Sequence, residues 1–254
     1  MRYLLGFLAL LLLASPASAG LSRAELSSVA AAPPPGARLD PNLAARDVTG
    51  KWRSVGELLA GHPIFFSFID YTCNTLCGTD LELLSAGIQN AHLDPADYRI
   101  VVFGLDPKDT AKDAFTMARK EIPAALLSRA VLLRPDAATV GRAARALGFH
   151  YRYDPAADQF AHPAAVYVIG SDGGVRGVLS PFALTVTDMK VVLAAAKPAL
   201  SLYDRVRLLC YCYDPQTGIY SLRIAWILRG ACLATLLTLG LAVFVFAKRA
   251  RAAA

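Results

Sequence analysis

The chain has 254 residues, of which 55% are hydrophobic and 18% charged, and its formal net charge is +6 at pH 7. Four of the positive charges belong to Arg2 and to the tail residues Lys248, Arg249 and Arg251, which leaves +2 for residues 20 to 247. This nearly neutral balance removes the main argument for nucleic-acid binding.

The N-terminal residues have the pattern of a secretory signal. Arg2 is followed by an apolar run from Leu4 to Ala14 and then by Ala17-Ser18-Ala19, which is an Ala-x-Ala cleavage site. We therefore expect residues 1–19 to be a signal peptide. Residues 20–35, rich in Ala, Ser and Pro, are expected to be a linker.

Between the linker and residue 200, apolar runs alternate with amphipathic stretches. The expected strands are Ile64–Ile69, Arg99–Leu105, Ala130–Arg134, Ala165–Ile169 and Val175–Leu179, and the expected helices are Gly78–His92, Thr110–Lys120, Ala137–Leu147 and Thr185–Ala196. The turn residues Ser171-Asp172-Gly173-Gly174 join the last two strands into a hairpin. Residues 36–200 are therefore predicted to form one α/β domain with a thioredoxin-like fold, in which helices flank a central mixed sheet.

The C-terminal part of the chain has a second long apolar stretch. Gly230 to Ala247 contains no charged residue and is followed by Lys248-Arg249. This pattern predicts a single transmembrane helix over residues 226–247, after a juxtamembrane segment at residues 201–225. The basic tail, residues 248–254, would be cytoplasmic, and the globular domain would lie on the other side of the membrane.

Cys73 and Cys77 are placed where the first central strand is expected to turn into a helix. A helix N-terminus lowers the pKa of a thiol, and thiolates are soft metal ligands and strong nucleophiles. Residues four apart on a helical turn are close enough to share a metal ion, and a small adjustment allows a disulfide. The sequence thus favours copper binding or disulfide exchange, while a pair of small buried side chains is the alternative without chemistry.

The spacing and number of the cysteines narrow the chemistry. Three residues separate Cys73 from Cys77, where the thioredoxin redox motif has two. The domain has no other cysteine, which excludes a structural disulfide framework. Copper in either oxidation state accepts two thiolates and an imidazole, whereas zinc normally needs a fourth ligand that the sequence does not offer.

His162 is the histidine whose context suits a third ligand. It precedes Pro163, so it should be extended at the start of the strand Ala165–Ile169. In thioredoxin-like domains a proline entering this strand faces the cysteine loop, which would bring His162 near both sulfurs. A solvent-exposed histidine at a strand start is the alternative, and His62, His92 and His150 are expected to be surface or packing residues.

Two further groups of residues have more than one interpretation. The run from Asp106 to Thr110 follows the next strand at the end where ligands bind in open α/β sheets, but Thr110 and Asp113 are more readily explained as a helix cap. Cys210-Tyr211-Cys212 lies between the domain and the membrane stretch. It is either a second copper relay or, more simply, part of an interfacial segment.

Taken together, these residues resemble the Sco/SenC copper-binding proteins, thioredoxin-fold factors associated with building the copper centre of cytochrome c oxidase. The resemblance rests on Cys73-x-x-x-Cys77 after an apolar strand, on the Asp106 to Thr110 run, on a single histidine 85 residues beyond Cys77 and on the Asp172-Gly173 turn. The C-terminal anchor preceded by Tyr213-Asp214-Pro215 is similar to that of a bacterial subgroup.

The resemblance implies that Cys73, Cys77 and His162 are copper ligands and that Cys73 and Cys77 can form a disulfide. This chain departs from the usual pattern, which commonly has proline beside the cysteines, because Asn74 and Gly78 follow them here, and Pro163 after the histidine is also not the commonest form. No donor atom is lost through these differences.

The leading hypothesis is a copper chaperone, tethered to the bacterial cytoplasmic membrane with its domain in the periplasm. It would pass copper to the binuclear copper centre of cytochrome c oxidase subunit II, and other copper chaperones or thiol reductases would be further partners. The alternative is a thiol-disulfide oxidoreductase in which Cys73 and Cys77 are catalytic and keep that subunit or other exported proteins reduced. A structural or peroxide-sensing thioredoxin-like module is a third hypothesis.

Overall fold

The computed structural model describes residues 20–73, 77–186, 188–196, 229–230 and 232–239. The expected signal peptide, juxtamembrane segment and basic tail lie outside these residues, as does most of the expected transmembrane helix. Within the described ranges, no helix is both long enough and apolar enough to cross a membrane.

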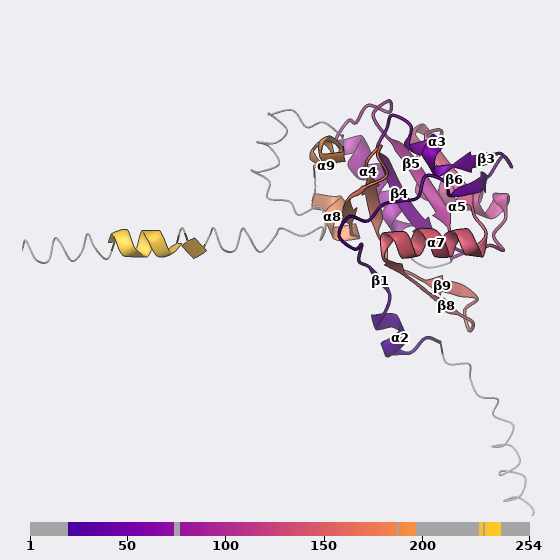
Figure 1. The fold of residues 1–254 in the computed structure, drawn as a ribbon, viewed down its shortest axis with the longest axis horizontal. Helices are drawn as coiled ribbons and strands as arrows, with labels where there is room; N and C mark the ends of the chain where they lie inside the picture. Colours follow the sequence, from indigo (N-terminus) through magenta and orange to yellow (C-terminus); the bar gives the residue numbers. More distant parts are fainter. Residues whose placement is uncertain (1–19, 74–76, 187, 197–228, 231, 240–254) are drawn as a thin grey trace, which may run out of the picture.

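A seven-stranded mixed sheet forms the centre of the domain (Figure 1). Its strands, in spatial order, are β11 (Val175–Leu179), β10 (Val166–Ile169), β4 (Ile64–Ile69), β5 (Arg99–Gly104), β6 (Ala130–Arg134), β2 (Ala44–Asp47) and β3 (Trp52–Ser54). β4, β5 and β6 are parallel, and an antiparallel pair flanks them on each side. All six residues of β4 are buried, as expected for a central strand that is covered on both faces.

Helices cover both faces of the sheet and enclose two hydrophobic cores. One face packs against α4 (Thr79–Asn90), α5 (Ala111–Glu121), α6 (Ala124–Leu127), α8 (Pro181–Val186) and α9 (Met189–Ala196). The other face packs against α3 (Val55–Leu59) and α7 (Ala137–Leu147). Side chains of β4 alternate between the cores, with Phe65 in the first and Phe66 in the second. The predicted α/β fold, a central mixed sheet flanked by helices, is therefore confirmed.

The sequence did not predict two of the antiparallel strand pairs in this domain. β2 and β3 extend the sheet beyond β6, and β8 (Arg152–Asp154) pairs with β9 (Gln159–Ala161) in a separate hairpin. These strands have three or four residues each and mix charged or polar with apolar side chains. Such short segments have no clear apolar periodicity, so only the register of the folded sheet reveals them.

The expected helix Thr185–Ala196 is replaced by two helices, α8 and α9. Pro181 occupies the first position of α8, where a missing N–H group costs nothing. The carboxylate of Asp188 accepts a hydrogen bond from the N–H of Lys190 at 2.8 Å and so caps the start of α9.

The expected linker contains ordered structure. Within residues 20–35, α2 (Arg23–Ser27) begins at a capping box made by Ser22 and Glu25, and β1 (Ala30–Ala31) pairs with β7 (Phe149–His150). The N–H of Ala32 donates to the carbonyl of Gly148 at 2.9 Å. This segment therefore packs against the domain instead of separating it from the N-terminus, and Figure 1 shows α2 beside the β8–β9 hairpin.

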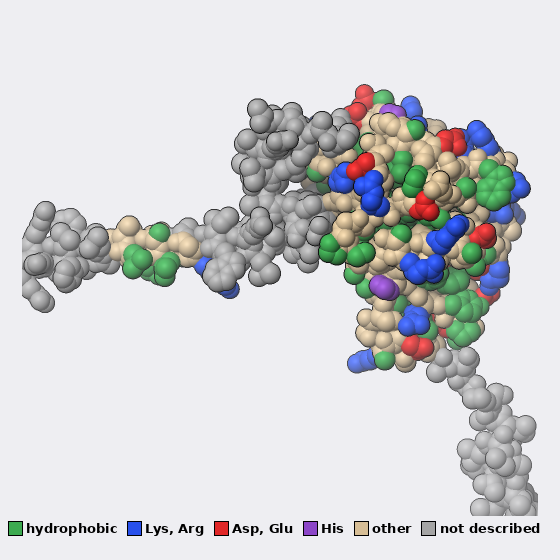
Figure 2. All heavy atoms as spheres, viewed as in Figure 1, with side chains coloured by type: hydrophobic (Ala, Val, Ile, Leu, Met, Phe, Trp, Pro, Cys, Tyr) green, Lys and Arg blue, Asp and Glu red, His purple; other side chains and the backbone are tan. Residues whose placement is uncertain are grey.

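Charged side chains are distributed over the domain surface. On the face shown in Figure 2, Lys and Arg side chains are interspersed with acidic and hydrophobic ones. This arrangement agrees with the nearly neutral charge of residues 20 to 247.

Asp80, in the first turn of α4, is a fully buried carboxyl group. The hydroxyl of Ser67 lies 2.6 Å from Oδ2 of Asp80 and 3.2 Å from the carbonyl oxygen of Ala165. The single proton of the Ser67 hydroxyl is donated to the carboxylate of Asp80, which is the closer acceptor. Burial raises the pKa of Asp80 to about 7, and the hydrogen bond from Ser67 opposes this rise only in part.

We expect Asp80→Asn to stabilise the protein, relative to wild type, more at pH 8 than at pH 5. In the unfolded chain Asp80 releases its proton near the ordinary pKa of 3.8, whereas in the folded chain it keeps the proton up to about pH 7. The free energy of unfolding contributed by Asp80 therefore falls as the pH rises from 3.8 to about 7. The relative gain is about 1–4 kcal/mol. Urea unfolding at the two pH values measures it, with the exposed Asp40→Asn as control; an equal effect at both pH values would contradict the prediction.

Candidate metal centre

Cys73 and Cys77 form a disulfide at the carboxyl end of β4, with their Cα atoms 6.0 Å apart. The chain leaves β4 at Ile69, makes a turn in which the N–H of Cys73 donates to the carbonyl of Asp70 at 3.3 Å, and enters α4 at Thr79. Both cysteines are half-buried. The sequence therefore located the pair correctly, at a strand-to-helix turn and within reach of a disulfide.

Buried polar groups hold the start of this cysteine loop, residues 70–73. The N–H of Tyr71 donates to Asp109 at 3.0 Å, and the hydroxyl of Thr72 lies 3.1 Å from a carboxylate oxygen of both Asp70 and Asp109. The phenol of Tyr71 reaches across the sheet to the carbonyl oxygens of Val102 and Leu133, at 3.0 and 2.9 Å. The loop is thus attached to β5 and β6 as well as to β4.

Asp109 lies in the run from Asp106 to Thr110, which follows β5. The sequence allowed two interpretations of this run, a helix cap and a ligand-binding position. Thr110 and Asp113 do form a capping box at the start of α5, so the cap is confirmed. Asp109, the residue before it, instead faces the cysteine loop. Burial raises the pKa of Asp109 to about 6, and the nearby charges of Asp70 and Asp106 act in the same direction. The run from Asp106 to Thr110 therefore contains both a residue that caps α5 and a residue that contacts the cysteine loop.

His162 lies shortly before β10, near the strand start where it was expected, and its ring is largely buried. Nδ1 is 3.1 Å from the carbonyl oxygen of Pro163, which favours the tautomer with the proton on Nδ1. Nε2 is buried and has no hydrogen-bond partner among the described residues. Burial lowers the pKa of the imidazole, against the opposing effects of the Pro163 carbonyl and the Asp70 charge. The ring therefore presents an unprotonated nitrogen, the form that binds metals.

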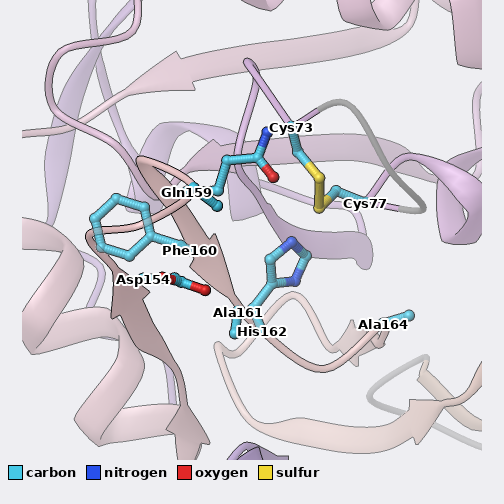
Figure 3. Close-up of a pocket in the computed structure, with 9 residues that line it drawn as sticks. Cys73, Cys77, Asp154, Gln159, Phe160, Ala161, His162 and Ala164 are labelled. Carbon is cyan, nitrogen blue, oxygen red and sulfur yellow. A yellow bond between two sulfur atoms is a disulfide. The ribbon is translucent and has the colours of Figure 1, made fainter. Parts of the chain in front are cut away.

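The disulfide and the His162 ring line the same pocket, a cavity of about 260 Å³ (Figure 3). Figure 3 shows the imidazole directed towards the disulfide, with the Gln159 amide close to the disulfide and the Phe160 ring farther away on the same wall of the pocket. The structure thus brings together the three predicted site residues. In this disulfide form, no group of three or more His, Cys, Asp or Glu side chains in the described part of the chain is arranged to hold a metal ion.

The other candidate residues lie elsewhere. His62 is half-buried, His92 and His150 are exposed, and none of the three lines this pocket. Cys210 and Cys212, the possible relay, lie outside the described residues.

The β8–β9 hairpin forms a wall of the pocket that sequence reasoning missed. Asp154, Gln159 and Phe160 line the cavity from this hairpin. The one signal was the turn-forming run Asp154-Pro155-Ala156-Ala157-Asp158 between two short aromatic-containing segments. Asp158 in this turn has a φ of +49°, a conformation that aspartate tolerates better than most residues.

Local packing explains why a glycine follows Cys77. A Cβ atom at Gly78 would lie 2.4 Å from Cγ of Glu121, which packs over the start of α4. A larger residue here requires Glu121 to move away from the cysteine loop. Gly78 therefore leaves room for the Glu121 side chain beside the cysteine loop.

Solved structures share this fold at low sequence identity. The SCO1/SenC family lipoprotein from Bacillus anthracis is 16% identical, with a TM-score of 0.53 over 63% of this chain and 94% of that chain. ScoI from Bradyrhizobium japonicum, solved with copper bound, is 18% identical, with a TM-score of 0.50 over 60% and 98% of the two chains. BsSco, a cytochrome c oxidase assembly protein of the Sco family with an identified disulfide switch, is 19% identical, with a TM-score of 0.50 over 65% and 94%.

No curated protein matches the chain. The family model for SCO1/SenC matches residues 44–197, which include the cysteine loop, the β8–β9 hairpin and His162. This match covers more than half of the sequence, and the chain therefore belongs to the SCO1/SenC family.

Proposed function

We propose that the protein is a copper chaperone that binds copper through Cys73, Cys77 and His162 and delivers it to the binuclear copper centre of cytochrome c oxidase subunit II. The observation that carries this proposal is the buried, unpartnered Nε2 of His162 in the pocket lined by both cysteines. Two sulfurs and one imidazole nitrogen form a donor set that suits copper. The copper-bound relative from Bradyrhizobium japonicum supports the choice of metal.

Copper loading first requires reduction of the disulfide. Two electrons and two protons from an external dithiol convert the Cys73–Cys77 bond into two thiols, and the dithiol becomes a disulfide. Copper(I) then displaces the thiol protons, because only thiolates bind metals. Neutral His162 supplies its nitrogen without losing a proton, so burial of this ring prepares it for binding.

Release to the partner would occur by ligand exchange. The pocket is open to solvent, so cysteine or histidine side chains of the acceptor subunit can approach one ligand at a time. Copper(I) tolerates two- and three-coordinate geometry, which allows intermediates with ligands from both proteins.

The proposal includes a membrane tether. The apolar stretch from Gly230 to Ala247 with its basic flank is the basis for placing the domain in the periplasm, next to membrane-bound oxidase subunits. The relative from Bacillus anthracis is a lipoprotein, which supports membrane association.

We expect the reduced full-length protein to bind one equivalent of copper(I) in competition with a chromogenic chelator. Cys73→Ser and Cys77→Ser should abolish stoichiometric binding, since each removes a thiolate. His162→Ala should weaken binding at least about tenfold, because loss even of a group that only orients a ligand costs that much.

Matched controls are His92→Ala, an exposed histidine away from the pocket, and Cys232→Ser, an exposed free cysteine outside the domain. Neither should change the affinity. Unchanged affinity in all three site variants would refute the ligand assignment.

A second candidate function, thiol-disulfide oxidoreductase, is favoured by another observation. Both cysteines also line a larger cavity, of about 640 Å³, on the α5 side of the disulfide, together with Lys112, Lys120 and Glu121. A client polypeptide can therefore approach the disulfide without crossing the His162 pocket. The disulfide switch identified in BsSco supports redox activity of the pair.

His162→Ala distinguishes the two functions. If the protein is an oxidoreductase, the reduced variant should reduce a model disulfide peptide at a rate within about threefold of wild type, because thiol attack requires only the cysteines. Copper binding should fall in the same variant. Wild-type protein that binds copper but shows no reduction above the Cys73→Ser, Cys77→Ser double variant would leave the chaperone as the only function.

A further inference from the structure

Asp70 follows β4 directly, and its carboxylate is fully buried behind the cysteine loop. Oδ1 accepts hydrogen bonds from the N–H and the hydroxyl of Thr72, both at 3.1 Å. Oδ2 accepts a hydrogen bond from the N–H of Phe160 in β9 at 2.9 Å. The two oxygens of one carboxylate are therefore divided between two segments that are 90 residues apart in the chain.

These two segments carry the proposed copper ligands. Thr72 immediately precedes Cys73, and Asp70 also accepts the N–H of Cys73 through its own carbonyl at 3.3 Å. Phe160 precedes His162 by two residues and lines the pocket with it. A hydrogen bond to a carboxylate is stronger than one to a neutral acceptor, so this contact fixes the separation of the two segments firmly.

The charge of Asp70 is not compensated by a cation. Among the ion pairs of the described residues, none involves Asp70. A buried carboxylate without a cationic partner is costly, and only its hydrogen bonds offset that cost. Its field also reaches the imidazole of His162. A metal ion bound beside His162 would lie in this field, and a doubly charged ion would gain more from it than a singly charged one.

Asp109 provides an internal comparison. It is also buried and contacts the same loop through Tyr71 and Thr72, but its further described hydrogen bonds are to Arg134 of β6, through its carbonyl, and to the carbonyl of Asp106, through its N–H. It has no described hydrogen bond to the β8–β9 hairpin. Removing the charge of Asp109 thus disturbs the loop without releasing the His162 segment.

We propose that Asp70 is a positioning residue that holds the His162 segment against the cysteine loop and favours copper(II) over copper(I) in the site between them. This inference rests on the proposed function. Asp70 makes no bond to copper itself in this arrangement. It acts by keeping Nε2 of His162 within reach of an ion held by both sulfurs, and by its negative charge.

The test compares Asp70→Asn with Asp109→Asn in the reduced full-length protein. We expect Asp70→Asn to lower the copper(II) affinity about 10- to 100-fold, the range found when groups that orient metal ligands are lost. The copper(I) affinity should fall less, by no more than the roughly tenfold loss expected for His162→Ala, because copper(I) keeps both thiolates and gains less from the lost charge. The nitrogen coupling in the copper(II) electron paramagnetic resonance spectrum should weaken, as in His162→Ala. Asp109→Asn, which disturbs the loop but not the His162 segment, should change the copper(I) and copper(II) affinities by the same factor and leave the nitrogen coupling as in wild type.

A second measurement needs no copper. Amide hydrogen exchange at Phe160 in the disulfide form should become at least about tenfold faster in Asp70→Asn and stay unchanged in Asp109→Asn, because a hydrogen bond to a charged acceptor is lost. Phe160→Pro approaches the same bond from the other side by removing the N–H donor. Its control, Phe160→Leu, loses the ring but keeps the donor. Phe160→Pro should lower the copper(II) affinity as Asp70→Asn does, and thermal unfolding checks that each variant is folded.

The possible outcomes separate this inference from the proposed function. If wild type binds copper and His162→Ala weakens it, but Asp70→Asn behaves like Asp109→Asn, the inference is overturned and the proposed function stands. Equal losses of copper(I) and copper(II) affinity in Asp70→Asn would overturn the preference for copper(II). If wild type binds no copper, the proposed function and the copper role of Asp70 both fail, and hydrogen exchange at Phe160 still decides whether Asp70 holds the hairpin.

Discussion

The cysteine loop depends on buried carboxylates at the carboxyl ends of β4 and β5. The chain turns sharply after Ile69, where Asp70 and Tyr71 are buried, and the turn directs backbone N–H groups at two carboxylates. Asp70 and Asp109 accept the N–H groups of Thr72 and Tyr71 and so make this turn possible. Backbone groups that are buried must be hydrogen-bonded, and negatively charged acceptors satisfy them most strongly. The position of the disulfide follows from this arrangement.

The parallel register of β4 and β5 brings these carboxylates together. Ile69 pairs with Gly104, so both strands end at the same level and the residues that follow them meet. Gly104 lies under the ring of Tyr71, where a Cβ atom would come within 2.7 Å of Cε2. A glycine at the end of β5 therefore lets the phenol of the cysteine loop lie flat on the sheet and reach two backbone carbonyls.

Much of the fold could be predicted from the sequence, because β4, β5 and β6 are long apolar runs and Thr110 and Asp113 form a recognisable cap. The pair Cys73 and Cys77 and its meeting with His162 also followed from position and family resemblance. The β8–β9 hairpin was missed, since strands of three residues carry almost no periodicity. The roles of Asp70 and Asp109 could not be predicted from the sequence for a different reason. They depend on which backbone N–H groups meet each carboxylate, and only the assembled strands decide that.

Gly148 allows the N-terminal segment to pack against the domain. Its φ is +60°, and a Cβ atom there would lie 2.1 Å from the carbonyl oxygen of Ala32. Any side chain at this position would push β1 away and leave the edge of β7 without a partner. Exposed strand edges pair with other molecules and promote aggregation. This glycine therefore keeps β1 paired with β7, and natural variation at position 148 should be limited.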